Sequence, residues 1–115
     1  MSGPDLFQVE IGPEALADID AIAAYLSEHA GADTARDFLD AVSARISSLE
    51  RFPYRGSEPK EFAGSNPVGY RQILLQHYRV FYRVQGSTVI IAMVADGRRD
   101  MQALVRDRHA PDPPA

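Results

Sequence analysis

The sequence predicts an α+β domain in which an N-terminal strand and an antiparallel helical hairpin pack on a three-strand antiparallel meander, followed by a short C-terminal helix. Three runs rich in Val, Ile, Leu, Tyr and Phe predict the meander, and they lie at 70–75, 78–84 and 88–95. Short polar or glycine connections separate them. Two apolar stripes at helical spacing predict the hairpin. The 115 residues suit one domain, at 1–109, with a proline-rich, disordered tail at 110–115.

The N-terminal strand and the first helix follow from local signals. Residues 6–11 alternate weakly between apolar and polar, as an edge strand does. Pro13 and Glu14 suit the first turn of a helix, where proline loses no hydrogen bond and an acid faces the positive end of the dipole. Gly31 suits its end as a left-handed cap. The apolar stripe of this helix is Leu16, Ile19, Ile22, Ala23 and Leu26.

A link of two to three residues leads to the second helix, so the two helices are expected to run antiparallel. Asp33 is a suitable N-cap, and Phe52-Pro53 ends the helix. Its stripe is Ala35, Phe38, Leu39, Val42, Ile46 and Leu49. Both stripes need an apolar partner, and the aromatic face of the sheet is the large one available. We expect a common core that contains Phe38, Val42, Leu49, Tyr82 and Ile90.

The segment 53–68 links the second helix to the sheet. Its three prolines and two glycines predict an irregular loop. A loop of this length in a small domain is often functional, and the alternative is a passive crossover. The sequence slightly favours the passive crossover, because Arg55 and Lys60 are the only bases in the loop.

The middle strand of the meander, 78–84, has two different faces. Alternate side chains point to opposite sides of a strand. One side therefore carries Tyr78, Val80, Tyr82 and Val84, and the other carries Arg79, Phe81 and Arg83. The first is a core face, and the second places a phenyl ring between two guanidinium groups. The last strand is apolar on both sides, which is typical of a central strand.

Composition excludes several classes of function. The chain has no cysteine, which excludes disulfides and thiolate chemistry and suits a cytoplasmic location. We expect no metal, because His29, His77 and His109 lie far apart, and no cofactor, because no nucleotide-binding motif occurs. We expect no export signal, because the N-terminus has neither a basic region nor an apolar run of that kind. We expect no membrane segment, because no apolar run approaches the ~20 residues that a span needs.

The charge is divided unevenly along the chain. The net charge is −4, yet residues 1–50 hold ten acids and two bases whereas residues 51–115 hold ten bases and six acids. A uniformly basic nucleic-acid binder is therefore excluded, whereas a basic sheet backed by acidic helices is allowed. The acidic total argues against strong electrostatic binding to RNA or ribosomes.

The arginines of the sheet are the candidate functional residues. They are Arg71, Arg79, Arg83, Arg98 and Arg99. The planar, always charged guanidinium binds phosphate or carboxylate in a forked geometry, so the cluster suits an RNA backbone or an acidic protein segment. The alternative is a structural role, in which Arg71 or Arg83 pairs with an acid of the loop or helices. Glu58 and Glu61 are candidates for that role.

Three motifs on this sheet resemble the RelE/ParE family of toxins from bacterial type II toxin–antitoxin modules, which includes plasmid stabilisation proteins. They are Gly69-Tyr70-Arg71, the run YRVFYRV at 78–84, and VADGRRD at 94–100. The family's strand has the form Y-R-apolar-apolar-Y-x-V, and its last strand ends in a polar residue, glycine and a basic-basic-acidic triplet. The resemblance covers nearly the whole chain, and it implies the same fold.

Within that family, one branch comprises ribosome-dependent mRNA endonucleases and another, ParE, poisons DNA gyrase. The endonucleases resemble this chain at Arg79 and at Arg98-Arg99, where the charges stabilise the scissile phosphate. They also use bases on the preceding strand and a Tyr or His near the C-terminus for proton transfer. Arg71 matches one such base, but Ile73 is apolar and the C-terminal position falls near Leu104-Val105, which offers neither Tyr nor His.

The resemblance therefore implies a ParE-like toxin and not a hydrolase. Such a toxin is expected to act on gyrase in the cytoplasm and to be neutralised by a cognate antitoxin. The residues expected to contact partners are Arg79, Phe81, Arg83, Arg98 and Arg99. The first alternative is a RelE-like endonuclease that acts on ribosome-bound mRNA with Arg71, Arg79 and Arg99. The second is an inactive module that only binds its antitoxin. A toxin–antitoxin hetero-oligomer is expected in each case.

Overall fold

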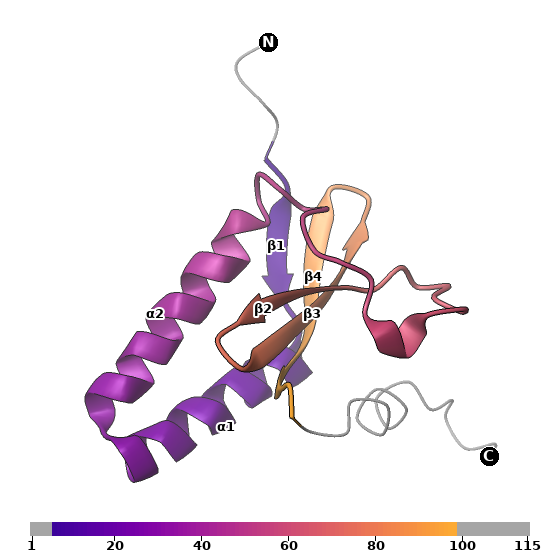
Figure 1. Cartoon of the computed structure of the whole chain (residues 1–115). Helices are drawn as coiled ribbons and strands as arrows, with labels where there is room; N and C mark the ends of the chain where they lie inside the picture. Colours follow the sequence, from indigo (N-terminus) through magenta and orange to yellow (C-terminus); the bar gives the residue numbers. More distant parts are fainter. Residues whose placement is uncertain (1–5, 99–115) are drawn as a thin grey trace, which may run out of the picture.

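The computed structural model describes residues 6–98 and confirms the α+β class, with two helices packed on a four-strand sheet (Figure 1). The elements are β1 (Gln8–Ile11), α1 (Pro13–Ala30), α2 (Ala32–Ser48), the 3₁₀ helix η1 (Lys60–Phe62), β2 (Arg71–Leu75), β3 (Tyr78–Gln85) and β4 (Thr88–Asp96). The predicted C-terminal helix and the tail 110–115 lie outside the described residues. Within residues 6–98, no helix is both long and apolar enough to span a membrane.

The sheet has the strand order β1-β4-β3-β2. The strands β2, β3 and β4 form the predicted antiparallel meander, whereas β1 lies parallel to β4 at the other edge. The strand β4 is thus a central strand, and its residues are apolar on both faces because one face joins the core under the helices and the other joins the cluster around Phe81. The hairpin of α1 and α2 covers one face of this sheet (Figure 1).

The connection between the helices is shorter than predicted. Gly31 alone separates α1 from α2, and it serves as the C-cap of one and the N-cap of the other. Its φ of 98° requires glycine, but its ψ of 159° is extended and not left-handed helical. Asp33 is therefore not the N-cap. It lies in the first turn of α2, where an acid is still favoured by the helix dipole.

The core between the helices and the sheet contains four of the five expected residues. Phe38, Val42, Leu49 and Tyr82 are buried in one cluster. Ile90 was assigned to that cluster wrongly. It is only half-buried and lies on the opposite face of β4, because its neighbours Val89 and Ile91 are the residues that point toward the helices.

The apolar stripes of the helices are also narrower than predicted. Ala15 and Ile19 are the buried residues of α1, while Leu16 is exposed. Leu39 on α2 is 40% exposed. These two leucines line a surface groove together with Ile11 at the end of β1.

A β-bulge in β4 decides which side chains reach each face. Phe81 pairs with Met93 and Tyr82 pairs with Ile91, so Ala92 is an extra residue on β4. The bulge shifts the alternation by one residue. Ile91 and Val94 both join the core below the helices, whereas Met93 and Ala95 join Phe81 on the other face.

Candidate functional site

The sheet face that turns away from α1 and α2 carries the candidate site, and we call it the open face. It is formed by Gln72, Arg79, Phe81, Arg83, Ile90, Met93 and Ala95. The loop 53–68 crosses to this side, where η1 lies beyond β2 and β3 (Figure 1). Phe62 of η1 packs against the cluster of Phe81, Met93 and Ala95. The loop is therefore more than a passive crossover, since it covers part of the open face.

Arg79 joins this loop to the sheet. Its Nη1 and Nη2 atoms donate to the two carboxylate oxygens of Glu61 at 2.8 and 2.7 Å, and its Nε donates to Oε1 of Gln72 at 2.7 Å. The guanidinium carbon also lies 4.8 Å from the ring centroid of Phe81. Arg79 is only 8% exposed, so the fork is occupied and largely withdrawn from solvent.

This ion pair corrects the expectation that an acid of the loop would pair with Arg71 or Arg83. Glu61 was proposed as a partner of Arg71 or Arg83, yet it binds Arg79. Glu58, the other candidate, accepts a hydrogen bond from Asn66. Charge pattern alone could not make this assignment, because the pair depends on how the loop folds back over the sheet.

The ion pair changes the titration of Glu61. The hydrogen bonds from Arg79 lower the pKa of its carboxyl below the ordinary value of 4.5, although burial opposes this shift by disfavouring the charged form. A lowered carboxyl pKa stabilises the folded state above the unfolded pKa, and that stability is lost as the pH falls through the folded pKa.

We therefore expect the free energy of unfolding to fall more steeply with acid in the wild type than in Glu61→Gln, which has no carboxyl to titrate at this position. Urea unfolding between about pH 7 and pH 3 measures the difference, which should develop below the ordinary Glu61 pKa of 4.5. The contributions of the other acids to the free energy of unfolding cancel in this comparison, because those acids titrate in both proteins. Two curves that stay parallel over this range would show that Glu61 does not contribute.

Arg71 and Arg79 are not brought together. Arg71 pairs with Tyr82 across the sheet, and Gln72 pairs with Phe81, so Arg71 lies on the helix side. Its Nη1 donates to the backbone carbonyls of Tyr54 and Gly56 at 3.1 and 2.8 Å. Arg71 therefore positions the start of the loop. Ile73, on the same side of β2, is buried in the core.

Two tightly packed contacts support the same region. The backbone N–H of Gly56 donates to the hydroxyl of buried Tyr82 at 2.9 Å. A Cβ at Gly56 would lie 2.6 Å from that hydroxyl and from the carbonyl oxygen of Gln72, so a side chain at this position would force the loop away from the sheet. Ser57 then bridges to Gln72 at the outer edge of β2.

The remaining arginines of the candidate site are placed differently. Arg83 is half-buried on the open face, and its Nη1 donates to Oε1 of Gln85 at 3.2 Å. Arg98 is exposed and binds the Asp96 carboxylate through Nε and Nη2. These hydrogen bonds hold the pKa of Asp96 below its ordinary range. Arg99 lies outside the described residues, so the arginines of the predicted ribonuclease set are not seen together.

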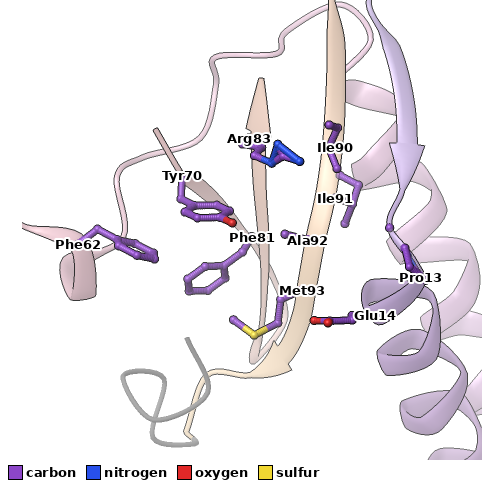
Figure 2. A pocket seen from close by; sticks show the side chains of 11 residues that line it. Pro13, Glu14, Phe62, Tyr70, Phe81, Arg83, Ile90, Ile91, Ala92 and Met93 are labelled. Atoms are coloured by element: carbon purple, nitrogen blue, oxygen red, sulfur yellow. The ribbon is translucent and has the colours of Figure 1, made fainter. Parts of the chain in front are cut away.

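The open face also contains a hollow of about 250 Å³, which Figure 2 shows from close by. Its lining is mostly aromatic and aliphatic, with Phe81, Tyr70, Ile90 and Met93 among its residues. Phe62 stacks on Tyr70 with ring centroids 5.1 Å apart. Sequence reasoning missed this hollow. Tyr70 belonged to a recognised motif and Phe62 to the loop, but only the fold places them side by side.

No group of side chains within residues 6–98 could hold a metal ion. The open face offers two kinds of feature in the described part of the chain. One is a buried ion pair that holds a loop, and the other is an apolar hollow with charged residues at its rim.

Comparison with known proteins shows the family and the fold of this chain. Residues 9–101 match the family model described as "ParE toxin of type II toxin-antitoxin system, parDE". A solved chain of the chromosomal ParDE system from P. aeruginosa is similar in fold, with a TM-score of 0.66 and 19% identity, covering 79% of this chain and 96% of that chain. A chain of the RelBE2 toxin–antitoxin complex from Mycobacterium tuberculosis has a TM-score of 0.55 and 20% identity, covering 79% and 98%. No curated protein matches this chain.

Proposed function

This chain belongs to the ParE toxins of type II toxin–antitoxin systems, and on that premise we propose that it poisons DNA gyrase in the cytoplasm and is neutralised by a cognate antitoxin. The two solved structures described above come from toxin–antitoxin systems, which supports an antitoxin partner. The choice of gyrase over mRNA depends on the chemistry that the open face can perform.

One observation favours gyrase. An RNA-cleaving site needs cationic groups for the phosphate and groups that transfer protons. The open-face residues of β2 that lie opposite β3 are Gln72 and Leu74, and neither can transfer a proton. Arg79, which lies opposite Leu74 on this face, already binds Glu61. Arg71 lies on the other face of the sheet.

The proposal is tested with the purified protein in two assays. We expect cleaved plasmid to accumulate when gyrase and ATP are present, and no mRNA cleavage in a translating extract. Adding the cognate antitoxin, produced from the neighbouring small reading frame, should abolish the effect on gyrase. Site-specific cleavage of ribosome-bound mRNA would overturn the proposal in favour of the endonuclease. Inactivity in both assays, with antitoxin binding retained, would identify an inactive module.

Arg83 provides a graded test of the same proposal. Binding energy at a protein–protein surface is spread over several anchors, so Arg83→Ala should reduce gyrase poisoning partially and not abolish it. Arg79→Ala should also weaken toxicity in a graded way, but Arg79 holds the loop and its loss affects the fold. Arg83 is the cleaner probe because its hydrogen bond to Gln85 is exposed. The measurement is the toxin concentration that gives half-maximal plasmid cleavage, with Arg36→Ala on the exposed surface of α2 as control.

A further inference from the structure

The segment that follows α2 carries exposed aromatic rings between arginines. Together with an arginine at the start of β2 it forms a surface that we call the arginine–aromatic patch, made of Arg51, Phe52, Tyr54, Arg55 and Arg71. Phe52 is 61% exposed and Tyr54 is 58% exposed, although phenylalanine is among the residue types most often found buried. Both rings are therefore accessible at the surface.

Contacts within the patch hold several of its side chains in place. The guanidinium carbon of Arg71 lies 5.2 Å from the ring centroid of Tyr54, and its Nη1 donates to the backbone carbonyl of Tyr54 at 3.1 Å. Phe7 packs edge-on against the same ring, with centroids 6.2 Å apart. The Nη1 atom of Arg55 donates to the hydroxyl of Ser48 at 2.9 Å. A surface that is already ordered loses little conformational entropy when a partner binds.

The patch is positively charged, and this charge is not neutralised within residues 6–98. None of its three arginines forms an ion pair with a carboxylate of that part of the chain. Arg71 and Arg55 both act on the hydroxyl of Tyr82. Burial raises the pKa of Tyr82 most, whereas the hydrogen bond from Gly56 and the charges of Arg71 and Arg55 lower it. The two guanidinium groups therefore lie in the same region of a chain whose net charge is −4.

We propose that the arginine–aromatic patch binds a DNA strand, and that the toxin uses it to hold the DNA on which gyrase acts. Guanidinium groups bind phosphate oxygens in a forked geometry, and exposed rings stack on unpaired bases of any sequence. An acidic protein segment would match the arginines, but it would not use the flat faces of two exposed rings. The inference rests on the proposed function and adds a nucleic-acid contact to it.

The charge of the whole chain sets the strength of this contact. Sequence-independent binding to nucleic acid typically has a dissociation constant of about 10⁻⁶–10⁻⁴ M. This toxin lies at the weak end of that range, because the acidic remainder of its surface repels phosphate. Gyrase holds its DNA next to the bound toxin, so a weak contact acts there at a high effective concentration.

The first test measures the binding of full-length toxin to a fluorescently labelled single-stranded oligonucleotide and to its duplex at low salt. The single strand should bind more tightly, because its bases are accessible for stacking. Phe52→Leu should weaken this binding by about tenfold, whereas Phe52→Tyr keeps a ring and should stay within about twofold of the wild type. Arg51→Gln should reduce the magnitude of the slope of log affinity against log salt by about 0.7, the value for one phosphate contact on a single strand.

Exposed residues of the two helices provide matched controls. Tyr25→Leu on α1 removes a ring that is also 61% exposed, and Arg36→Gln on α2 removes an exposed arginine. Each should leave DNA binding within about twofold of the wild type, because these residues lie outside the patch. The melting temperatures of the Phe52 and Arg51 variants should stay close to that of the wild type, since both side chains are exposed.

The second test repeats the plasmid-cleavage assay with gyrase. Phe52→Leu and Arg51→Gln should each raise the toxin concentration that gives half-maximal cleavage, by about tenfold for Phe52→Leu. Phe52→Tyr should restore the potency of the wild type. The dissociation constant of the antitoxin should be the same for all three variants, which shows that the loss does not come from misfolding.

The outcomes distinguish this inference from the function on which it rests. If the wild type promotes no plasmid cleavage but binds the oligonucleotide through the patch, the gyrase function fails and the DNA-binding surface stands. If the wild type poisons gyrase but binds neither oligonucleotide, or binds equally well after Phe52→Leu, the DNA-binding surface is wrong and the function stands. A wild type that does neither overturns both. If the substitutions weaken antitoxin binding or gyrase poisoning while DNA binding is unchanged, the patch contacts a protein, which also overturns the inference.

Discussion

Replacing Arg79 with methionine is expected to lower the free energy of unfolding by about 3–5 kcal/mol, the usual cost of breaking a buried ion pair from one side. The carboxylate of Glu61, which is 6% exposed, would keep its charge but lose both hydrogen bonds from the guanidinium. Gln72 would lose its partner as well. Urea unfolding followed by circular dichroism at neutral pH measures this loss.

A double variant shows whether the loss comes from the ion pair. Arg79→Met combined with Glu61→Met removes both charges and should recover most of the stability, because apolar side chains of similar volume can replace a buried pair at little cost. The control is Arg83→Met on the same strand, which should change stability by less than about 0.5 kcal/mol because Arg83 forms no buried ion pair with any other residue of 6–98. If the separately measured costs of Arg79→Met and of Glu61→Met added up to the cost of the double variant, the pair would not be coupled.

Replacing Leu49 with alanine is expected to cost about 2–5 kcal/mol, the range for a leucine that leaves a cavity in a core. Leu49 lies just beyond the end of α2, is 0% exposed and belongs to the cluster that joins the helices to the sheet. The cost combines the lost burial of the side chain with the cavity left behind, because the surrounding aromatic and β-branched residues cannot fully close around it. Chemical unfolding measures it directly.

The chain offers a matched control in Leu39, which is the same residue type and lies within α2 but is 40% exposed. Leu39→Ala should cost less than about 1 kcal/mol, because little apolar surface is returned to water. The sequence placed both leucines on one apolar stripe, so equal costs for the two substitutions would support that prediction. They would also contradict the packing seen in the structure.

Local patterns were sufficient for most of the fold. The alternation in β3 identified Tyr78, Val80 and Tyr82 as core residues and Arg79 and Phe81 as residues of the other face, and both assignments are confirmed. The meander and the helical hairpin were also predicted. These features depend on side-chain period and turn residues, which are properties of neighbouring positions in the chain.

The candidate site could be predicted only in part. The sequence identified the arginines, but it could not show that Arg79 binds Glu61, which lies eighteen residues earlier in a loop without regular pattern. It also could not show that Arg71 faces the opposite side of the sheet from Arg79, because the faces of neighbouring strands depend on their register. A shift of one residue exchanges the two faces of a strand.

The sequence by itself therefore determined the elements, their order and the two faces of β3. The tertiary structure decided the pairing of β1 with β4, the bulge at Ala92, the exposure of Leu39, and the hollow between the loop and the sheet. The physical reason is the range of the interactions. Helical stripes and strand alternation depend on residues a few positions apart, whereas register, bulges and ion pairs arise only when distant segments pack together.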